Sequence, residues 1–151
     1  MPLPAKKNIV FVHGSGASTL SYNFLEIWLP EHNVLYIEYD SQETPGEIVV
    51  RIQRQIYEEF GNDPFSVVAH SYGCLLAMKA VITFENCKEF VAMSAPWGGS
   101  RTAKWLSYAF RNSKLFNALN PKSVFITALQ SVNNKFKIIN VVTTGNNGAG
   151  N

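Results

Sequence analysis

Hydrophobic residues along the chain fall into five short runs, separated by longer segments in which they recur at helical spacing. The runs are rich in β-branched residues and are bounded by turn residues, which is typical of buried strands. They are NIVFV (8–12), VLYIEY (34–39), FSVVA (65–69), EFVAMS (89–94) and KIINVVT (137–143). Strands that alternate with helices need crossover connections. The pattern therefore predicts an α/β fold with a doubly wound, mostly parallel sheet of about five strands and helices on both faces.

Helices are predicted between these strands. Residues 19–29 carry apolar side chains at helical spacing and stop at a proline. The clearest helix start is Thr44, with Pro45 at the first position and Glu47 three residues after the cap, a combination that forms a capping box. That helix carries isoleucine or phenylalanine at every fourth position and is closed by a glycine. Another helix is predicted over 72–82, and a helix-prone region extends to about residue 130.

Length and composition indicate one globular domain over residues 1–151. Apolar residues make up 46% of the chain and charged residues 16%, which excludes a disordered protein. Residues 1–96 carry six basic and eleven acidic side chains, whereas residues 97–151 carry seven basic and no acidic ones. The basic part either faces an anionic membrane surface or acidic partner, or is an ordinary solvated face.

The two cysteines, Cys74 and Cys87, are too few for a disulfide framework. We expect free thiols and hence a reducing, cytoplasmic environment. The apolar run near the amino terminus has only four or five residues before a His-Gly pair, so no signal peptide is predicted. No segment approaches the roughly 20 apolar residues that span a membrane.

The stretch VVAHSYGCLLAMKA (67–80) places a serine at the corner between a buried strand and a helix. Ser71 in such a corner is exposed at a strained turn, close to the free N–H groups and partial positive charge of a helix amino terminus. The small residues Ala69 and Gly73, two positions before and after it, permit the sharp turn. The corner therefore predicts a nucleophile; the alternative is that Ser71 only caps the helix.

A second loop is expected to face this corner. If the strands lie in the order second-first-third-fourth-fifth, the loop after Val12 lies beside the corner after Ala69. The backbone N–H groups of Ser15 and Tyr72 would then form an oxyanion hole. His13 and Gly14 either shape this loop or form a plain turn.

The sequence predicts no bound metal and no other cofactor. It contains no cluster of His, Cys and Asp with the spacing of metal ligands. The HGSGAS segment lacks the lysine of a phosphate-binding loop. Nothing in the sequence predicts a nucleic-acid partner, and it leaves the oligomeric state open.

Three segments resemble the lipase branch of the α/β-hydrolase superfamily: VFVHGSGAS, VVAHSYGCLLA and SAPWGGS. The A-H-S-x-G form is similar to that of the minimal bacterial lipases. The HSYGC and APWGGS pair resembles lecithin:cholesterol acyltransferase and related phospholipases. The resemblance implies a small α/β-hydrolase that cleaves carboxylic esters of lipid-like substrates through an acyl-enzyme. By position, Ser71 is the nucleophile, and Ser15 and Tyr72 supply the oxyanion hole. An acyltransferase is the alternative reaction.

The chain departs from the family pattern in its acid and base. Superfamily members carry an Asp or Glu and then a His after the serine. Here no Asp and no His follows Ser71, and the two later glutamates lie before the fourth predicted strand (Glu85) and at its first residue (Glu89). Three explanations are open: the acid and His belong to a longer protein, the chain is a catalytically incomplete binding protein, or His13 acts as the base. We expect the first, because the rest of the site is consistent with catalysis.

Residues 101–120 carry aromatic and aliphatic side chains on one side of a predicted helix and basic side chains on the other. In related lipases the region after the P-x-G-G-S loop contributes to a cap over the site. Residues 101–130 are therefore a candidate cap segment, with residues 101–120 as a candidate contact to a membrane surface. An ordinary amphipathic helix packed on the sheet explains the same pattern.

Overall fold

The computed structural model describes residues 5–23, 29–40, 42–97, 114 and 135–142. Within them five strands form one sheet in which all neighbours are parallel. The strands are β1 (Asn8–Val12), β2 (Asn33–Ile37), β3 (Phe65–His70), β4 (Cys87–Met93) and β5 (Lys137–Val141). The predicted α/β class and the number of strands are confirmed.

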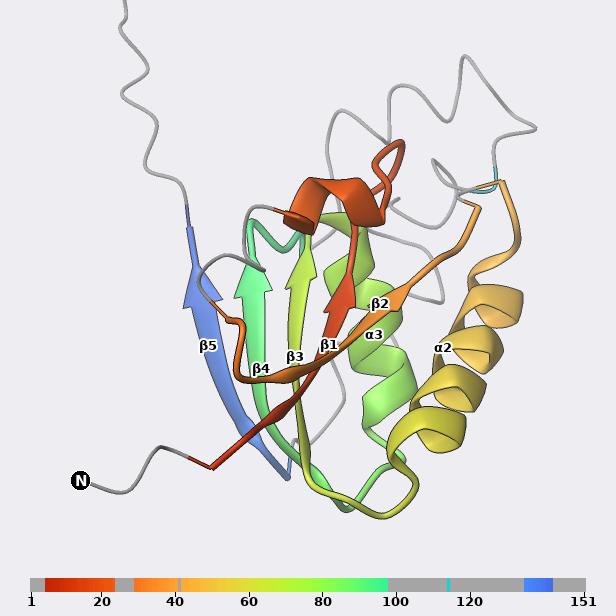
Figure 1. The fold of residues 1–151 in the computed structure, drawn as a ribbon. Coiled ribbons are helices and arrows are strands. Elements are labelled where there is room, and N and C mark those ends of the chain that lie inside the picture. The colour runs from red at the N-terminus through yellow and green to blue at the C-terminus, as the bar shows by residue number, and fades with distance from the viewer. Residues whose placement is uncertain (1–4, 24–28, 41, 98–113, 115–134, 143–151) are drawn as a thin grey trace, which may run out of the picture.

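The strand order places two distant loops side by side. The order is β2-β1-β3-β4-β5, as expected from the sequence. Val12, the last residue of β1, lies opposite Ala69 near the end of β3. All strand arrowheads lie at the same end of the sheet (Figure 1). The segments that follow β1 and β3 therefore leave the sheet next to each other.

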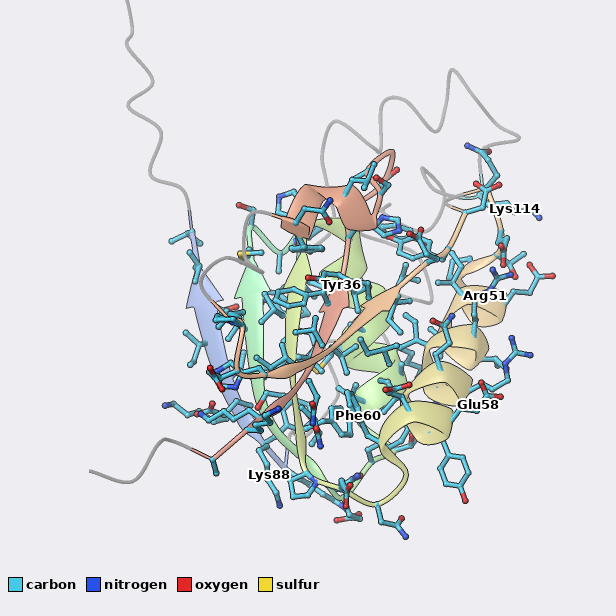
Figure 2. The ribbon with its side chains drawn as sticks, in the orientation of Figure 1. Tyr36, Arg51, Glu58, Phe60, Lys88 and Lys114 are labelled. Carbon is cyan, nitrogen blue, oxygen red and sulfur yellow. The ribbon has the colours of Figure 1, made fainter. Side chains whose placement is uncertain are left out.

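One face of the sheet is covered by two helices that also pack on each other, α2 (Pro45–Phe60) and α3 (Tyr72–Val81). In α2 every fourth residue is buried, whereas the opposite side carries charged residues (Figure 2). The buried residues of α2 are Ile48, Ile52, Ile56 and Phe60. In α3 almost every residue is buried, and the helix packs against both the sheet and α2. The apolar stripe read from the sequence is thus the contact that holds α2 in place.

The other face carries a smaller cluster around η1 (Thr19–Tyr22), a short 3-10 helix. The rings of Phe11 in β1 and Tyr22 in η1 lie 4.8 Å apart, centroid to centroid. Helices on both faces are therefore confirmed, although on this face the described helix is only the single turn of η1. The helix predicted over 19–29 is described only at its start, since residues 24–28 lie outside the described ranges.

The predicted capping box at the start of α2 is present. The Thr44 hydroxyl accepts a hydrogen bond from the Glu47 N–H, and the Glu47 carboxylate accepts one from the Thr44 N–H. We expect Thr44→Ala to lower the free energy of unfolding by about 1 kcal/mol, because the Glu47 N–H loses its acceptor and the Glu47 carboxylate loses the hydroxyl that donates to it. Urea denaturation of the purified protein measures the change. Thr44→Ser keeps the cap and serves as the control; an alanine variant as stable as the serine variant would contradict the prediction.

None of the helices in the described part of the chain combines the length and hydrophobicity that crossing a bilayer requires. The candidate cap, residues 101–130, lies outside the described residues except for Lys114. The two cysteines are free thiols, as expected from the sequence.

Candidate active site

Ser71 occupies the corner between β3 and α3 in a backbone conformation that residues other than glycine rarely adopt. Its φ is +51° and its ψ is −124°. Such a backbone stores strain and persists only where neighbouring contacts fix it. Here the Ser71 N–H donates to the Met93 carbonyl at 2.9 Å, and the Ser71 carbonyl accepts from the Cys74 N–H at 3.0 Å. The corner is therefore held on both sides by backbone hydrogen bonds.

The Ser71 hydroxyl is not used to cap α3. The residue stands at the N-cap position, but its side chain makes no capping hydrogen bond. An N-cap serine with β-region backbone angles accepts, at its side-chain oxygen, a hydrogen bond from a backbone N–H of the first turn. Ser71 has neither that backbone nor that bond, so capping does not account for it. The strained corner instead places a half-buried serine beside the first turn of α3.

Gly73 permits an unusually close approach of α3 to the end of β1. A Cβ atom at this position would lie 2.2 Å from the His13 carbonyl oxygen and 2.7 Å from that of Val12. Both are backbone atoms of a buried strand end, so neither can swing aside. Glycine is required here by contact with the loop after β1, in addition to the sharpness of the corner.

The loop after β1 lies directly against Ser71. A Cβ atom at Gly14 would be 3.3 Å from the Cβ of Ser71 and 3.0 Å from Nδ1 of His70. The Ala17 N–H donates to the Gly14 carbonyl at 3.3 Å, which folds residues 14–17 into a turn. The structure thus brings together the two segments that the sequence placed side by side. The His70 imidazole is exposed and lies against this loop.

The amide groups of Ser15 and Tyr72 remain available. Within the described residues, neither N–H donates to a hydrogen-bond acceptor. Ser15 is exposed in the turn after β1, and Tyr72 is the first residue of α3. Free N–H groups at a helix start and in a neighbouring loop are able to bind negative charge.

His13 is buried beneath this loop, with 1% of its surface exposed. Its Nδ1–H donates to the Gly14 carbonyl at 2.8 Å, and its ring stacks on Tyr39 with the centroids 4.2 Å apart. The Nε2 atom is buried and has no partner among the described residues. These contacts tie the His13 side chain to the loop that begins at Gly14.

Cys74, three residues after Ser71, is not a rival nucleophile. Burial raises the pKa of its thiol to about 12, and its Sγ lies 3.7 Å from the Met93 carbonyl oxygen. The reactive form of cysteine is the thiolate, which such an environment disfavours. Within the described residues no group of three or more His, Cys, Asp or Glu side chains is placed to hold a metal ion.

The start of the APWGGS segment is fixed to the edge of the sheet. Ser94, directly after β4, also has a positive φ of +51°, and its N–H donates to the Val141 carbonyl at 2.8 Å. The Trp97 indole N–H donates to the Asn140 side-chain oxygen at 2.9 Å. Residues 98–100 lie outside the described residues. The sequence signalled this segment only through its likeness to lipases.

Two tyrosines near the site were not singled out from the sequence. The hydroxyl of Tyr22 donates to the Val12 carbonyl at 2.7 Å, and that of Tyr39 donates to the His13 carbonyl at 2.6 Å. Nothing in the local sequence predicts these contacts, because each joins residues ten or more positions apart. They fix the two carbonyl groups against which Gly73 packs.

No protein-family model matches the chain. Among curated proteins it is similar to the probable lysophospholipase BODYGUARD 4 of Arabidopsis thaliana, with 29% identity over 103 residues. The match covers 60% of this chain and 25% of that protein. The chain thus spans about a quarter of the length of that relative.

Solved structures share the fold. The chain resembles the mature lipase BlEst2 of Bacillus licheniformis with a TM-score of 0.65 and 21% identity, covering 86% of this chain and 60% of that one. It resembles the phospholipase PlaB of Legionella pneumophila with a TM-score of 0.75 and 16% identity, covering 91% of this chain and 39% of that one. The described part of the chain therefore has the α/β-hydrolase fold of lipases and phospholipases, and the resemblance drawn from the sequence is confirmed.

Proposed function

We propose that this chain carries the nucleophile and oxyanion hole of a serine hydrolase that cleaves carboxylic esters of lipid-like substrates. The observation that carries the proposal is the Ser71 corner, where a strained serine with an uncommitted hydroxyl lies against the loop that begins at Gly14. Strain of this kind clusters at functional sites. The relative and the two structural neighbours described above, which are a probable lysophospholipase, a lipase and a phospholipase, support the same reaction class.

The proposed reaction passes through an acyl-enzyme. The Ser71 oxygen attacks the ester carbonyl carbon as its proton passes to a base, and the alcohol leaves with a proton when its C–O bond breaks. Water then attacks the acyl carbon and releases the carboxylic acid, which restores the serine. In both steps the N–H groups of Ser15 and Tyr72 stabilise the oxyanion. An alcohol in place of water would make the same site an acyltransferase.

The base and the acid that orients it are proposed to come from residues outside these 151. No Asp or His follows Ser71 in the sequence. His13 is a poor candidate for the base, because a base must reach the serine proton. Its ring is instead buried against Tyr39, with Nδ1 committed to the Gly14 carbonyl. A catalytically incomplete binding protein is the alternative, which activity of the full-length protein would exclude.

The cellular setting is also a proposal. Two free, buried thiols are compatible with a reducing compartment such as the cytoplasm. A lipid acyl ester as substrate is supported by what the curated relative's name says of that protein. Contact of residues 101–120 with a membrane surface remains a proposal that rests on the sequence pattern alone.

A substitution that displaces the loop after β1, which carries the Ser15 N–H, tests this function. In the full-length protein we expect Gly14→Val to slow hydrolysis of short p-nitrophenyl esters about 10²-fold, comparable to losing one oxyanion donor. The valine side chain would push the loop away from Ser71 and His70, which already lie at contact distance from a Cβ at this position. Gly46→Val is the control, because a Cβ there meets nothing within 4 Å. Wild-type turnover in a folded Gly14→Val protein would remove this loop from the mechanism.

A further inference from the structure

Two buried tyrosines each donate a hydrogen bond to a backbone carbonyl at the end of β1. The carbonyls are those of Val12, the last residue of β1, and of His13, which follows it. Tyr22 reaches Val12 from η1 on one face of the sheet, and Tyr39 reaches His13 from the segment after β2. Tyr22 and Tyr39 are 3% and 7% exposed. Burial raises the pKa of both hydroxyl groups above the ordinary tyrosine value, so both remain protonated donors. The strand end is thereby fixed from two directions.

Tyr39 makes two separate contacts with His13. Its hydroxyl donates to the His13 carbonyl at 2.6 Å, and its ring lies parallel to the imidazole, with 3° between the two planes. The same imidazole donates through Nδ1 to the Gly14 carbonyl. The orientation of the peptide groups on both sides of Gly14 is therefore coupled to the position of one tyrosine.

The carbonyl that Tyr39 holds is also the one that Gly73 packs against. The position of a Cβ on Gly73 would be 2.2 Å from this oxygen, so any rotation of the His13–Gly14 peptide changes the contact with α3. Ser71 precedes Gly73 by two residues and lies beside Gly14, where a Cβ atom would be 3.3 Å from the Cβ of Ser71. Tyr39 is thus placed to set the spacing between the loop and the corner, although it contacts neither Ser71 nor Ser15 in the described contacts.

We propose that Tyr39 is a positioning residue for acyl transfer: its hydroxyl, by fixing the His13 carbonyl, aims the Ser15 N–H at the oxyanion. This inference rests on the proposed function. A buried carbonyl without its donor is costly, and the peptide would turn to find another partner. A displaced loop stabilises the transition state less well while leaving contacts to the remainder of the substrate unchanged.

Tyr39→Phe in the full-length protein tests the proposal, because it keeps the stacked ring and removes only the hydroxyl. We expect kcat for a p-nitrophenyl ester to fall about tenfold with KM within about twofold, less than the loss of a whole donor. Affinity for a trifluoromethyl ketone, which adds to the Ser71 oxygen and places an oxyanion in the hole, should fall by the same factor. Tyr57→Phe is the control, because Tyr57 is 67% exposed on α2.

The outcomes separate this proposal from the one it rests on. Rates are compared at a temperature at which circular dichroism shows both variants folded. Unchanged kcat in folded Tyr39→Phe, or a change in KM with unchanged ketone affinity, overturns the positioning role alone. If a fluorophosphonate fails to label Ser71 in the wild-type protein, the proposed function is wrong, and the proposed role of Tyr39 is then wrong as well.

Discussion

Ser71→Ala is expected to lower ester hydrolysis by the full-length protein by several orders of magnitude, on the order of 10⁴-fold to 10⁶-fold. The reason is that the acyl-enzyme cannot form without the serine oxygen, and what remains is catalysis by the oxyanion hole and substrate binding. Initial rates with a short p-nitrophenyl ester measure the effect. The fold should persist, since the hydroxyl makes no capping hydrogen bond that the structure would lose.

Ser66→Ala is the matched control for this measurement. Ser66 lies in β3, the strand that leads to Ser71, near the end farthest from the corner. The Ser66→Ala protein should hydrolyse the ester at the wild-type rate. A Ser71→Ala protein that is folded and only a few-fold slower than the Ser66→Ala protein would show that Ser71 is not the nucleophile.

Gly73→Ala is expected to have the largest effect on stability. Its Cβ would lie 2.2 Å and 2.7 Å from two backbone oxygens, those of His13 and Val12, so α3 must move away from the strand end. Overpacking at a site that cannot relax costs several kcal/mol, and we expect a loss of about 4 kcal/mol or failure to fold. Urea denaturation gives the free energy of unfolding, and the yield of soluble protein reports the extreme case.

Gly46→Ala provides the comparison, because it is the same substitution in an open position of α2. It should be neutral or should stabilise by up to about 1 kcal/mol, since alanine favours the helix. If both alanine variants unfold at the same urea concentration, the close approach of α3 to the end of β1 is wrong.

The sequence was sufficient to predict the elements whose signals are local. The capping residues Thr44 and Glu47 and the glycine at 61 define α2 at both ends, and the structure begins and ends that helix where they indicate. The β-branched runs place all five strands. Their bounds shift by a few residues, and β4 begins at Cys87, two residues earlier than predicted. The Asn86 side chain binds the carbonyls of Gly61 and Asp63, a long-range contact that no local pattern contains.

The placement of the two segments of the candidate site was predictable for a related reason. The Ser71 corner is a local feature, and the strand order that brings it beside Gly14 is one that the general rules for doubly wound sheets allow. The contacts of Tyr39 with His13 were not predictable, because a tyrosine at the end of a predicted strand is typical of the core. The role we propose for Tyr39 depends on a hydroxyl that donates to the His13 carbonyl, 26 residues away in the sequence. Contacts of this kind appear only when the chain is folded.

The identity of the residue that a fluorophosphonate modifies tests the central claim most directly. The full-length native protein is treated with the probe, digested, and the modified peptide is sequenced by mass spectrometry. The account predicts a single adduct on Ser71, formed in the native protein and absent after heat denaturation, because an unactivated serine does not react. An adduct on another residue, or ester hydrolysis by a protein that forms no adduct, would contradict it.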